Sequence, residues 1–316
     1  MKRNSKFEIR NPKSKGRGAA IMLALWALFL LAAMVISWVL DIDARFSLSA
    51  NANRRLEATA LACSGAEVAL HPMVKPGSPN LRRQINDRRS YEARMTGEGG
   101  RLNLNGIVGL ALVGQEARLD VLRRYLEKKE IDINERDTMI DSLLDWMSPG
   151  GGLHRLNAPP ESDNYHPAHA LFTRIDELKN VFGWADFTSK AGWDDDFTVN
   201  TNPNDPIDVT SASRAVLLAL LPAMNENIVD RFLELRRGPD GIDGTSDDMQ
   251  FKSLPEIQTA LGLSQDQFRV LAPLIGFNSQ VYRVVSIGKS GDAQRTVRLV
   301  FRKTGGAPQV ITWKEY

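Results

Sequence analysis

An uncharged, apolar run at residues 19–40 constrains this chain more than any other feature of its sequence. An α-helix rises about 1.5 Å per residue, so about 20 apolar residues cross the roughly 30 Å hydrocarbon core of a membrane. The run is long enough to do so. We therefore expect a transmembrane helix that anchors residues 41–316 to a membrane.

Charged residues on either side of the run predict its orientation. Asp41 and Asp43 follow it, whereas residues 1–18 contain Glu8 and seven basic side chains, Lys2, Arg3, Lys6, Arg10, Lys13, Lys15 and Arg17. Positively charged flanks stay in the cytoplasm. We expect a cytoplasmic N-terminus and place residues 41–316 across the membrane.

Three interpretations of the N-terminus are open. A cleaved secretory signal needs a shorter apolar core and a small-residue cleavage site, and residues 41–47 contain no clean site. A plain single-pass anchor keeps its leader. A cut between Gly18 and Ala19 would instead leave a mature chain that begins with its own membrane helix.

A helical pattern continues beyond the apolar run to about residue 73. Gly65 is the only glycine in this stretch, and Pro72 is its first proline. Apolar residues recur at helical spacing, while arginines and glutamates fill the other faces; the apolar positions are Phe46, Leu56, Ala60, Leu61, Ala66 and Leu70. We expect one continuous helix of roughly 50 residues, half in lipid and half packed on a water-exposed domain.

Charge and cysteine content exclude some classes of function. The net charge is +2, and the basic leader supplies more than all of it, so residues 41–316 are mildly acidic. They lack the basic surface that general nucleic-acid binding requires. Cys63 is the one cysteine, so no intramolecular disulfide forms, and we expect it to serve as a small apolar helix residue.

Strand and helix patterns alternate in the outer region. Residues 90–96 and 101–105 flank a glycine-rich turn and predict a hairpin. Residues 281–287, 295–302 and 309–313 alternate in polarity and predict a closing antiparallel meander. Between them lie helical patterns, with caps expected at Asn134, Asn225, Ser253 (a capping box with Glu256) and Ser264.

These patterns predict an α+β fold in which a long N-terminal transmembrane and stem helix packs on an antiparallel sheet that carries an inserted all-α domain. The N-terminal part is expected to consist of a leader at 1–18, a transmembrane helix at 19–40 and the stem at 41–73. The first strands of the sheet follow at 88–105, and the inserted helical domain spans 106–193. The rest of the sheet-containing core, at 194–316, is expected to contain a strand, a small helical module and three C-terminal strands.

Four segments in this order resemble the K-type minor pseudopilins of type II secretion systems, the general secretion pathway protein K family. The first segment is Gly18 with the apolar helix that follows it, GAAIMLALWALFLLA at 18–32. The others are RLNLN at 101–105, DSLLDWMSPGG at 141–151 and FTVNTN at 197–202. The resemblance covers essentially the whole chain and implies a pilin-like fold.

The resemblance also implies a role without catalysis. Such subunits join I- and J-type minor pseudopilins at the tip of a periplasmic pseudopilus that exports folded proteins across the outer membrane. Prepilin peptidase would cut between Gly18 and Ala19 and methylate the new N-terminus. The chain would then be a single-pass protein of the bacterial inner membrane with a periplasmic C-terminal domain. No nucleic acid or small-molecule substrate is implied.

Leu23 occupies the position of the pilin glutamate, the fifth residue after the expected cut. A carboxylate in lipid costs roughly 2.5–3.5 kcal/mol and becomes tolerable when it pairs with a neighbouring subunit's N-terminal amine. A subunit at the tip has no subunit above it and needs no such contact. The absence of Glu therefore fits the K-type family and a tip position.

A glycine-bent acidic loop is a candidate calcium site. Hard oxygen ligands suit Ca²⁺, and the K-type family is known to bind calcium; the candidate ligands are Asp240, Asp243, Asp247 and Asp248. The alternative is a solvated turn in which these residues serve only turn geometry. We expect Asp194, Asp195 and Asp196 to form a loop leading into a strand. His166 and His169 lack a third zinc ligand nearby.

Two rival functions are open. A generic membrane-anchored adaptor predicts an uncut leader and no pseudopilin partners. A helix-hairpin-helix DNA-binding module at residues 199–274 would need a glycine turn that approaches phosphate, but residues 221–225 contain none, and an acidic loop lies close by. For a pseudopilin, we expect partner subunits to contact the exposed stem face that includes Phe46, Leu56 and Ala60.

Overall fold

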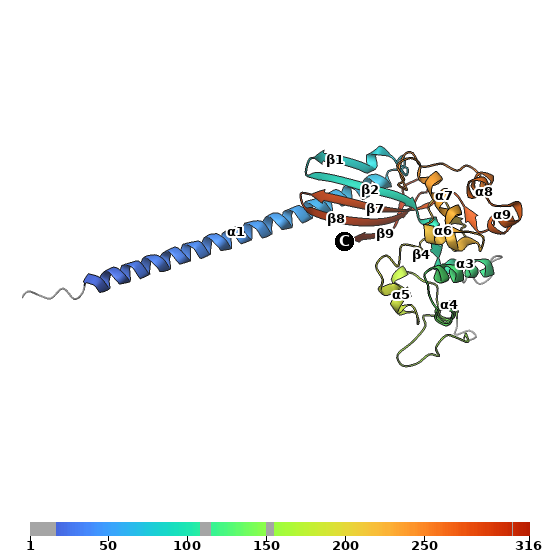
Figure 1. Ribbon diagram of the computed structural model, residues 1–316, viewed down its shortest axis with the longest axis horizontal. Helices are drawn as coiled ribbons and strands as arrows, with labels where there is room; N and C mark the ends of the chain where they lie inside the picture. The colour runs from blue at the N-terminus through green and yellow to red at the C-terminus, as the bar shows by residue number, and fades with distance from the viewer. Residues whose placement is uncertain (1–16, 108–114, 150–154, 305) are drawn as a thin grey trace, which may run out of the picture. The chain divides into compact units, whose positions relative to one another are not determined.

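The computed structural model of this chain describes residues 17–107, 115–149, 155–304 and 306–316. It divides into two compact units, Met1–Leu56 and Glu57–Tyr316. Helix α1 (Arg17–Leu70) contributes to both units, and it is the long blue helix of Figure 1. We describe each unit by itself.

The first unit consists, in its described part, of the N-terminal portion of α1. The helix contains no proline, and Gly18 and Gly65 are its only glycines, so nothing interrupts its hydrogen bonding. Its apolar segment has a mean hydropathy of 2.7 and no buried residue. The predicted apolar helix is thus present and is long and apolar enough to cross a membrane.

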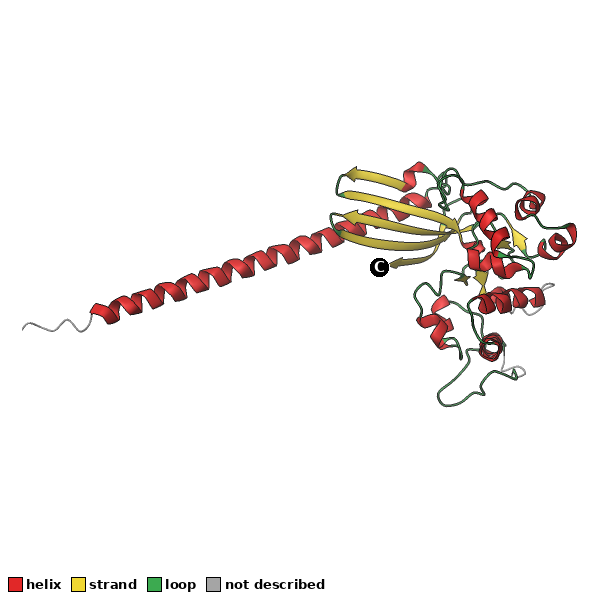
Figure 2. Cartoon of the chain, viewed as in Figure 1, coloured by secondary structure: helices red, strands yellow, loops and turns green. Residues whose placement is uncertain are grey.

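A five-stranded antiparallel sheet forms one layer of the second unit (Figure 2). Its order is β1-β2-β7-β8-β9, so two strands from early in the chain join three from its end. The strands are β1 (Arg82–Asn86), β2 (Arg89–Gly97), β7 (Val281–Ser290), β8 (Ala293–Arg302) and β9 (Gln309–Glu315). The predicted closing meander is confirmed.

The C-terminal part of α1 packs on one face of this sheet through small side chains. Ala62, Ala66 and Ala69 are fully buried against a core that includes Met95, Val284, Val297, Leu299 and Phe301. Gly288 of β7 allows the helix backbone to approach, since a Cβ there would collide with the Ala58 carbonyl and the Ala62 amide. The helix ends at Leu70, two residues before Pro72, because proline cannot continue a helix.

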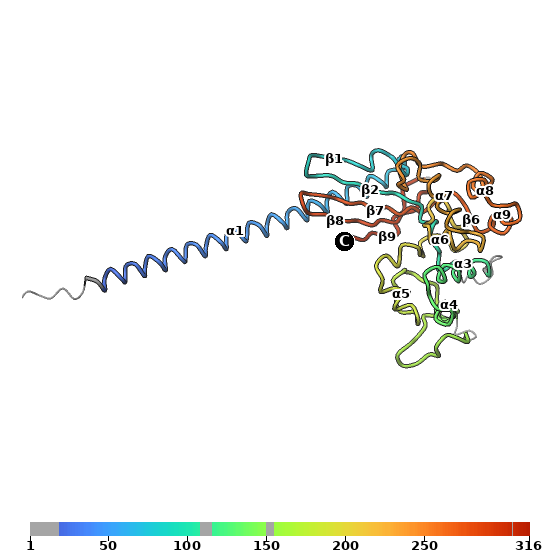
Figure 3. Tube along the Cα trace, viewed as in Figure 1, coloured from blue at the N-terminus to red at the C-terminus, as the bar shows by residue number. Residues whose placement is uncertain are grey.

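Between β2 and β7 the chain leaves the sheet and forms a helical body beyond the end where β2 finishes and β7 begins (Figures 1 and 3). The helices are α2 (Leu104–Ile107), α3 (Gln115–Lys128), α4 (Ile133–Met147), α5 (Ala185–Ser189), α6 (Arg214–Leu220), α7 (Glu226–Arg237), α8 (Leu254–Leu261) and α9 (Gln265–Leu271), with 3-10 turns η1 (Pro79–Leu81), η2 (Glu98–Gly100) and η3 (Ile175–Asn180).

One hydrophobic core runs through this body, from Leu102 to Ile275. Trp184, Phe187 and Phe197 meet edge to face at its centre, with ring centroids 5.5–5.9 Å apart, a favourable aromatic geometry. The core draws residues from both sides of the boundary predicted between residues 193 and 194. Helices early and late in the body therefore stabilise one another.

The predicted hairpin between residues 90–96 and 101–105 is wrong. β3 (Leu102–Asn103) pairs in parallel with β4 (Phe197–Thr198), because Leu102 and Leu104 are both buried in the helical body. The hairpin partner of β2 is instead β1, which precedes the residues expected to form the first strands. A second short parallel pair joins β5 (Ile207–Asp208) to β6 (Ile275–Gly276).

The helix caps follow the sequence in part. Asn225 and Ser264 cap α7 and α9 as predicted. Asp132, not Asn134, caps α4, since it reaches the Asn134 amide. Ser253 precedes α8 without a side-chain cap, and Glu256 instead accepts from the Lys252 amide. The predicted α+β fold class, with a long helix packed on an antiparallel sheet, is confirmed despite these corrections.

Candidate functional site

The apolar part of α1 is the first candidate site. Every side chain of residues 19–40 is exposed within the described structure, and Leu23 is 71% exposed. Apolar surface of this extent is unfavourable in water. The segment therefore requires lipid or other apolar helices around it.

The predicted cleavage pair lies at the start of this helix. Gly18 and Ala19 are helical and follow Arg17, the first described residue. The leader before Arg17 lies outside the described residues. Cleavage between Gly18 and Ala19 stays a prediction.

The stem positions expected to meet partners are also exposed. Phe46 is 71% and Leu56 69% exposed. Within the second unit, Ala60 is exposed while Ala58 and Ala62 are buried. In the part of α1 that belongs to the second unit, the face away from the sheet therefore stays exposed, and an exposed helix face can pack against another helix.

A buried ion pair joins the sheet to the helical body. Glu98 of η2 is fully buried, and its two carboxylate oxygens accept from Arg283 of β7 at 2.7 and 2.8 Å. Arg101 lies 3.2 Å from the same carboxylate, and the Thr198 hydroxyl of β4 donates to it at 2.6 Å. Three segments thus converge on one carboxylate.

The charges at this junction determine its ionisation. Burial alone would raise the pKa of Glu98, but Arg283 and Arg101 outweigh it, so the pKa lies below the ordinary value. Burial and the nearby Arg283 charge lower the pKa of Arg101 to about 10. At neutral pH the junction is therefore ionic.

The predicted acidic loop before β4 belongs to the same junction. Asp194 accepts from Arg298 of β8 at 2.7 Å, and Asp196 accepts from the Tyr125 hydroxyl at 2.7 Å. Both carboxylates therefore connect elements of the fold. This geometry gives Asp194 and Asp196 a structural role.

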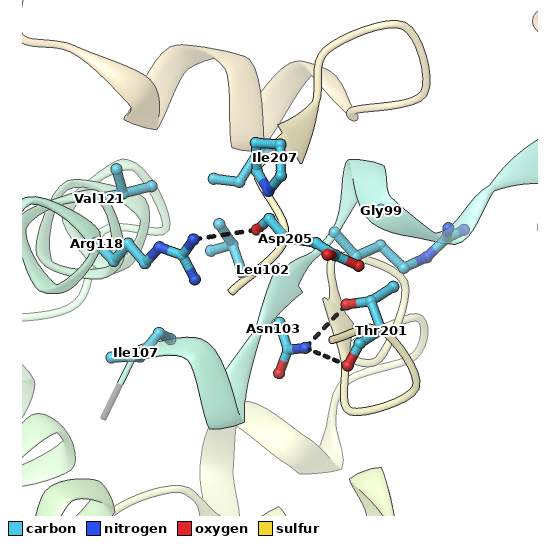
Figure 4. Close-up of a pocket in the computed structure, with 11 residues that line it drawn as sticks. Gly99, Leu102, Asn103, Ile107, Arg118, Val121, Thr201, Asp205 and Ile207 are labelled. Carbon is cyan, nitrogen blue, oxygen red and sulfur yellow. Dashed lines mark hydrogen bonds between the residues drawn. The ribbon is translucent and has the colours of Figure 1, made fainter. Parts of the chain in front are cut away.

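A small cavity of about 20 Å³ lies between η2, α3 and the loop before β5 (Figure 4). Asn103 donates to the Thr201 carbonyl at 2.9 Å, and Arg118 donates to the carbonyls of Pro203, Asn204 and Asp205. The volume suffices for about one water molecule and is far below that of a ligand pocket. Asn103 and Arg118 therefore hold residues 201–205 in place by hydrogen bonds to their carbonyls.

The carboxylates of the acidic loop 238–248 have different partners. Asp243 accepts from Arg236 at 2.7 Å and from Arg237 at 3.0 Å, so both its oxygens are engaged. Arg236 is buried and also donates to the carbonyls of Val209 and Ala212. Asp243 therefore anchors the loop to α7.

The remaining carboxylates of the loop bond to its turns. Asp247 accepts from the Thr245 hydroxyl at 2.7 Å and the Asp240 amide at 3.1 Å, and these bonds lower the pKa of Asp247. Asp248 accepts from the Gly244 amide at 2.7 Å, although burial raises the pKa of Asp248.

The four candidate carboxylates of this loop have partners within the protein. Among residues 17–107, 115–149, 155–304 and 306–316, no group of three or more His, Cys, Asp or Glu side chains is arranged to hold a metal ion. Calcium binding stays a prediction that needs solution measurement.

The predicted helices α8 and α9 form a helical hairpin whose turn is at residues 262–264, whereas the hairpin turn was expected at residues 221–225. Gly262 has a φ of 64°, and its amide bonds to the carbonyls of Gln258 and Thr259. The Leu263 amide bonds to Gln258 and the Ser264 amide to Gln267. Because all three turn amides have acceptors within the protein, they are not free to bind phosphate, which disfavours DNA binding. The sequence feature that could have predicted this turn is Gly262, which lies between Leu261 and Leu263.

Comparison with solved structures gives a match over nearly the full chain. The match is to a chain in the crystal structure of the GspK-GspI-GspJ complex from the enterotoxigenic Escherichia coli type 2 secretion system. The TM-score is 0.56 with 12% identity, covering 87% of this chain and 98% of that one. This protein has the fold of that pseudopilin complex chain. At this identity, the likeness establishes the fold and leaves the function to be argued.

Comparison with protein-family models gives no match. Comparison with curated proteins gives no match either. The likeness in fold agrees with the pilin-like fold that the four sequence segments imply.

Proposed function

We propose that this protein is a K-type minor pseudopilin that acts without catalysis at the tip of a type II secretion pseudopilus. The observation that carries the proposal is the near full-length match to a chain of the GspK-GspI-GspJ complex. The exposed apolar helix and the order of the four sequence segments support it.

The first part of α1 anchors the subunit in the inner membrane before assembly and packs against other subunits' helices afterwards. Its exposed apolar surface supports both states, because lipid and neighbouring apolar helices cover it equally well. In this proposal the N-terminus is cytoplasmic and the second unit periplasmic, as the charge flanks predict.

Leu23 supports a position at the tip. An apolar side chain at the fifth position of the mature chain offers no carboxylate to the N-terminal amine of a subunit above. A subunit that caps the pseudopilus has no such neighbour.

I- and J-type minor pseudopilins are the proposed partners. The matched structure is a complex of GspK with GspI and GspJ, and this chain leaves a strip of α1 at Phe46, Leu56 and Ala60 exposed. Helix-on-helix packing along this strip would hold the tip complex together.

Prepilin peptidase processing tests the proposal against the adaptor alternative. The full chain is co-expressed with the peptidase, and the intact mass of the product is measured beside that of Gly18→Val. We expect a mature chain that begins at methylated Ala19, and no cut in the variant. An uncut parent chain beginning at Met1 would favour an ordinary membrane-anchored adaptor.

A further inference from the structure

His169 fastens a long loop to the C-terminal end of α4. Its Nδ1 lies 3.1 Å from the Ser148 carbonyl oxygen, at the end of the helix, and its Nε2 lies 2.6 Å from Glu161 Oε1. Glu161 and His169 both belong to residues 155–174, which lie in the loop between α4 and η3. The His169 side chain therefore contacts both another residue of the loop, Glu161, and the C-terminal end of α4 at Ser148.

Both neighbours of this imidazole are hydrogen-bond acceptors. A backbone carbonyl accepts only, and so does an ionised carboxylate. A neutral imidazole has a single N–H, so it can satisfy one of the two contacts and must turn a lone pair toward the other oxygen. With Glu161 ionised, the geometry therefore favours the doubly protonated, positively charged ring.

The backbone at His169 shows that this contact is held against strain. Its φ of 49° lies in the left-handed region, which is unfavourable for a residue with a side chain. Flanking bonds hold it there: the Ala170 amide donates to Trp146 at 3.2 Å and the Phe172 amide to Asn105 at 2.8 Å.

The charged groups that face His169 favour its cation. Glu161 approaches from the loop and Asp145 from α4, and both carboxylates raise the pKa of His169, the Glu161 hydrogen bond most of all. The same bond lowers the pKa of Glu161, with a smaller contribution from the nearby His166.

We propose that His169 is a proton-dependent clamp that holds the loop of residues 155–174 against the end of α4 and releases it when the ring loses its proton. The clamp needs two charged partners at once. The loop it controls carries two apolar side chains that are already at the surface, Leu156 (94% exposed) and Leu171 (49% exposed), so its release moves them relative to the helical body.

The pH window follows from the two pKa shifts. His169 has a raised folded pKa, so its contribution is complete below the ordinary histidine value of about 6.5 and is lost as pH rises through the raised value. Glu161 has a lowered folded pKa, so its contribution is present above its ordinary value and is lost as pH falls through the lowered one. The clamp is closed between these limits.

The ring is tested directly by NMR titration of histidine Cε1–H signals in the full chain in detergent, with His169→Gln used to assign the signal. We expect His169 to titrate above the ordinary value in the parent and to return toward it in Glu161→Gln. Titration at the ordinary value in both proteins would overturn the proposal.

The loop is tested by amide hydrogen exchange of peptides from residues 155–174, normalised at each pH to the unfolded chain. We expect protection at pH 6 that is lost by pH 9 in the parent, and lost at both pH values in His169→Gln. His166→Gln, at an exposed position, is the matched control and should follow the parent. Equal protection at both pH values in the parent would contradict the clamp.

Discussion

At the scale of single residues, Glu98 and Arg283 connect parts of the chain that are 185 positions apart. No local pattern identifies such a pair, because each residue alone looks like an ordinary surface charge. The structure buries both, which makes the pair expensive to break: removing one partner of a buried ion pair costs about 3–5 kcal/mol.

Glu98→Gln should therefore destabilise the protein strongly, because it leaves Arg283 charged in a buried site. Thermal unfolding would show a large fall in Tm. Glu92→Gln is the matched control, since Glu92 contacts Arg82 and Arg94 at the surface, where such pairs are worth about 0–1 kcal/mol. Equal effects of the two substitutions would show that the Glu98 junction is not needed for stability.

The same pair predicts a pH dependence. The folded pKa of Glu98 is lowered, so its stabilising contribution is present above the ordinary glutamate value and is lost as pH falls through the lowered value. We expect the parent's Tm to fall more steeply on acidification than that of Glu98→Gln. Parallel Tm profiles between neutral pH and pH 3 would argue against this assignment.

At the scale of elements, the sequence predicted those strands and helices whose burial produces a periodic pattern. β8 was predictable because Val297, Leu299 and Phe301 are buried on alternate positions. β1 was not, since all five of its residues are exposed and its strand form depends on pairing with β2. The two-residue pairing of β3 with β4 depends on tertiary contact alone.

The candidate sites were predictable to a smaller degree. The exposed apolar helix follows directly from residues 19–40. The clustering of Asp240, Asp243, Asp247 and Asp248 in sequence suggested a ligand set, but Arg236 and Arg237 take Asp243 away from it. The spacing of the aspartates in the sequence could not show that two arginines bind Asp243.

Close packing of α1 on the sheet gives a prediction about Gly288. A methyl group there meets the backbone of Ala58 and Ala62, which cannot move aside as a flexible side chain can, so Gly288→Ala should cost about 1–3 kcal/mol. Gly306→Ala is the control, because nothing lies within 4 Å of its added Cβ. Chemical denaturation of both variants measures the difference, and a neutral Gly288→Ala would refute the packing.

Calcium binding by the acidic loop is tested with Asp247→Ala rather than Asp243→Ala, since Asp243 holds the loop through two arginines whether or not an ion binds. If calcium binds the folded state, it raises the Tm of the parent by mass action. We expect Asp247→Ala to lose that rise and the exposed Asp292→Ala to keep it. No calcium effect on the parent would exclude the site.

At the scale of the whole molecule, the two parts of the chain require different surroundings. Residues 19–40 are apolar on every side and need lipid or other helices, whereas the second unit has its own cores in the sheet and in the helical body. A subunit built in this way is anchored by one part and presents the other. If the protein is the pseudopilin that we propose, Leu23 stands in the place of the pilin glutamate, and a position at the tip fits it.

The most direct test of this account is co-expression of the full chain with the I- and J-type minor pseudopilins of its own secretion system, followed by purification through a tag on this chain. We predict a stable ternary complex that Leu56→Asp with Ala60→Asp disrupts. Val270→Asp, exposed on α9, should leave the complex intact. Purification of the unsubstituted chain without either partner, from cells that contain both, would contradict the central claim.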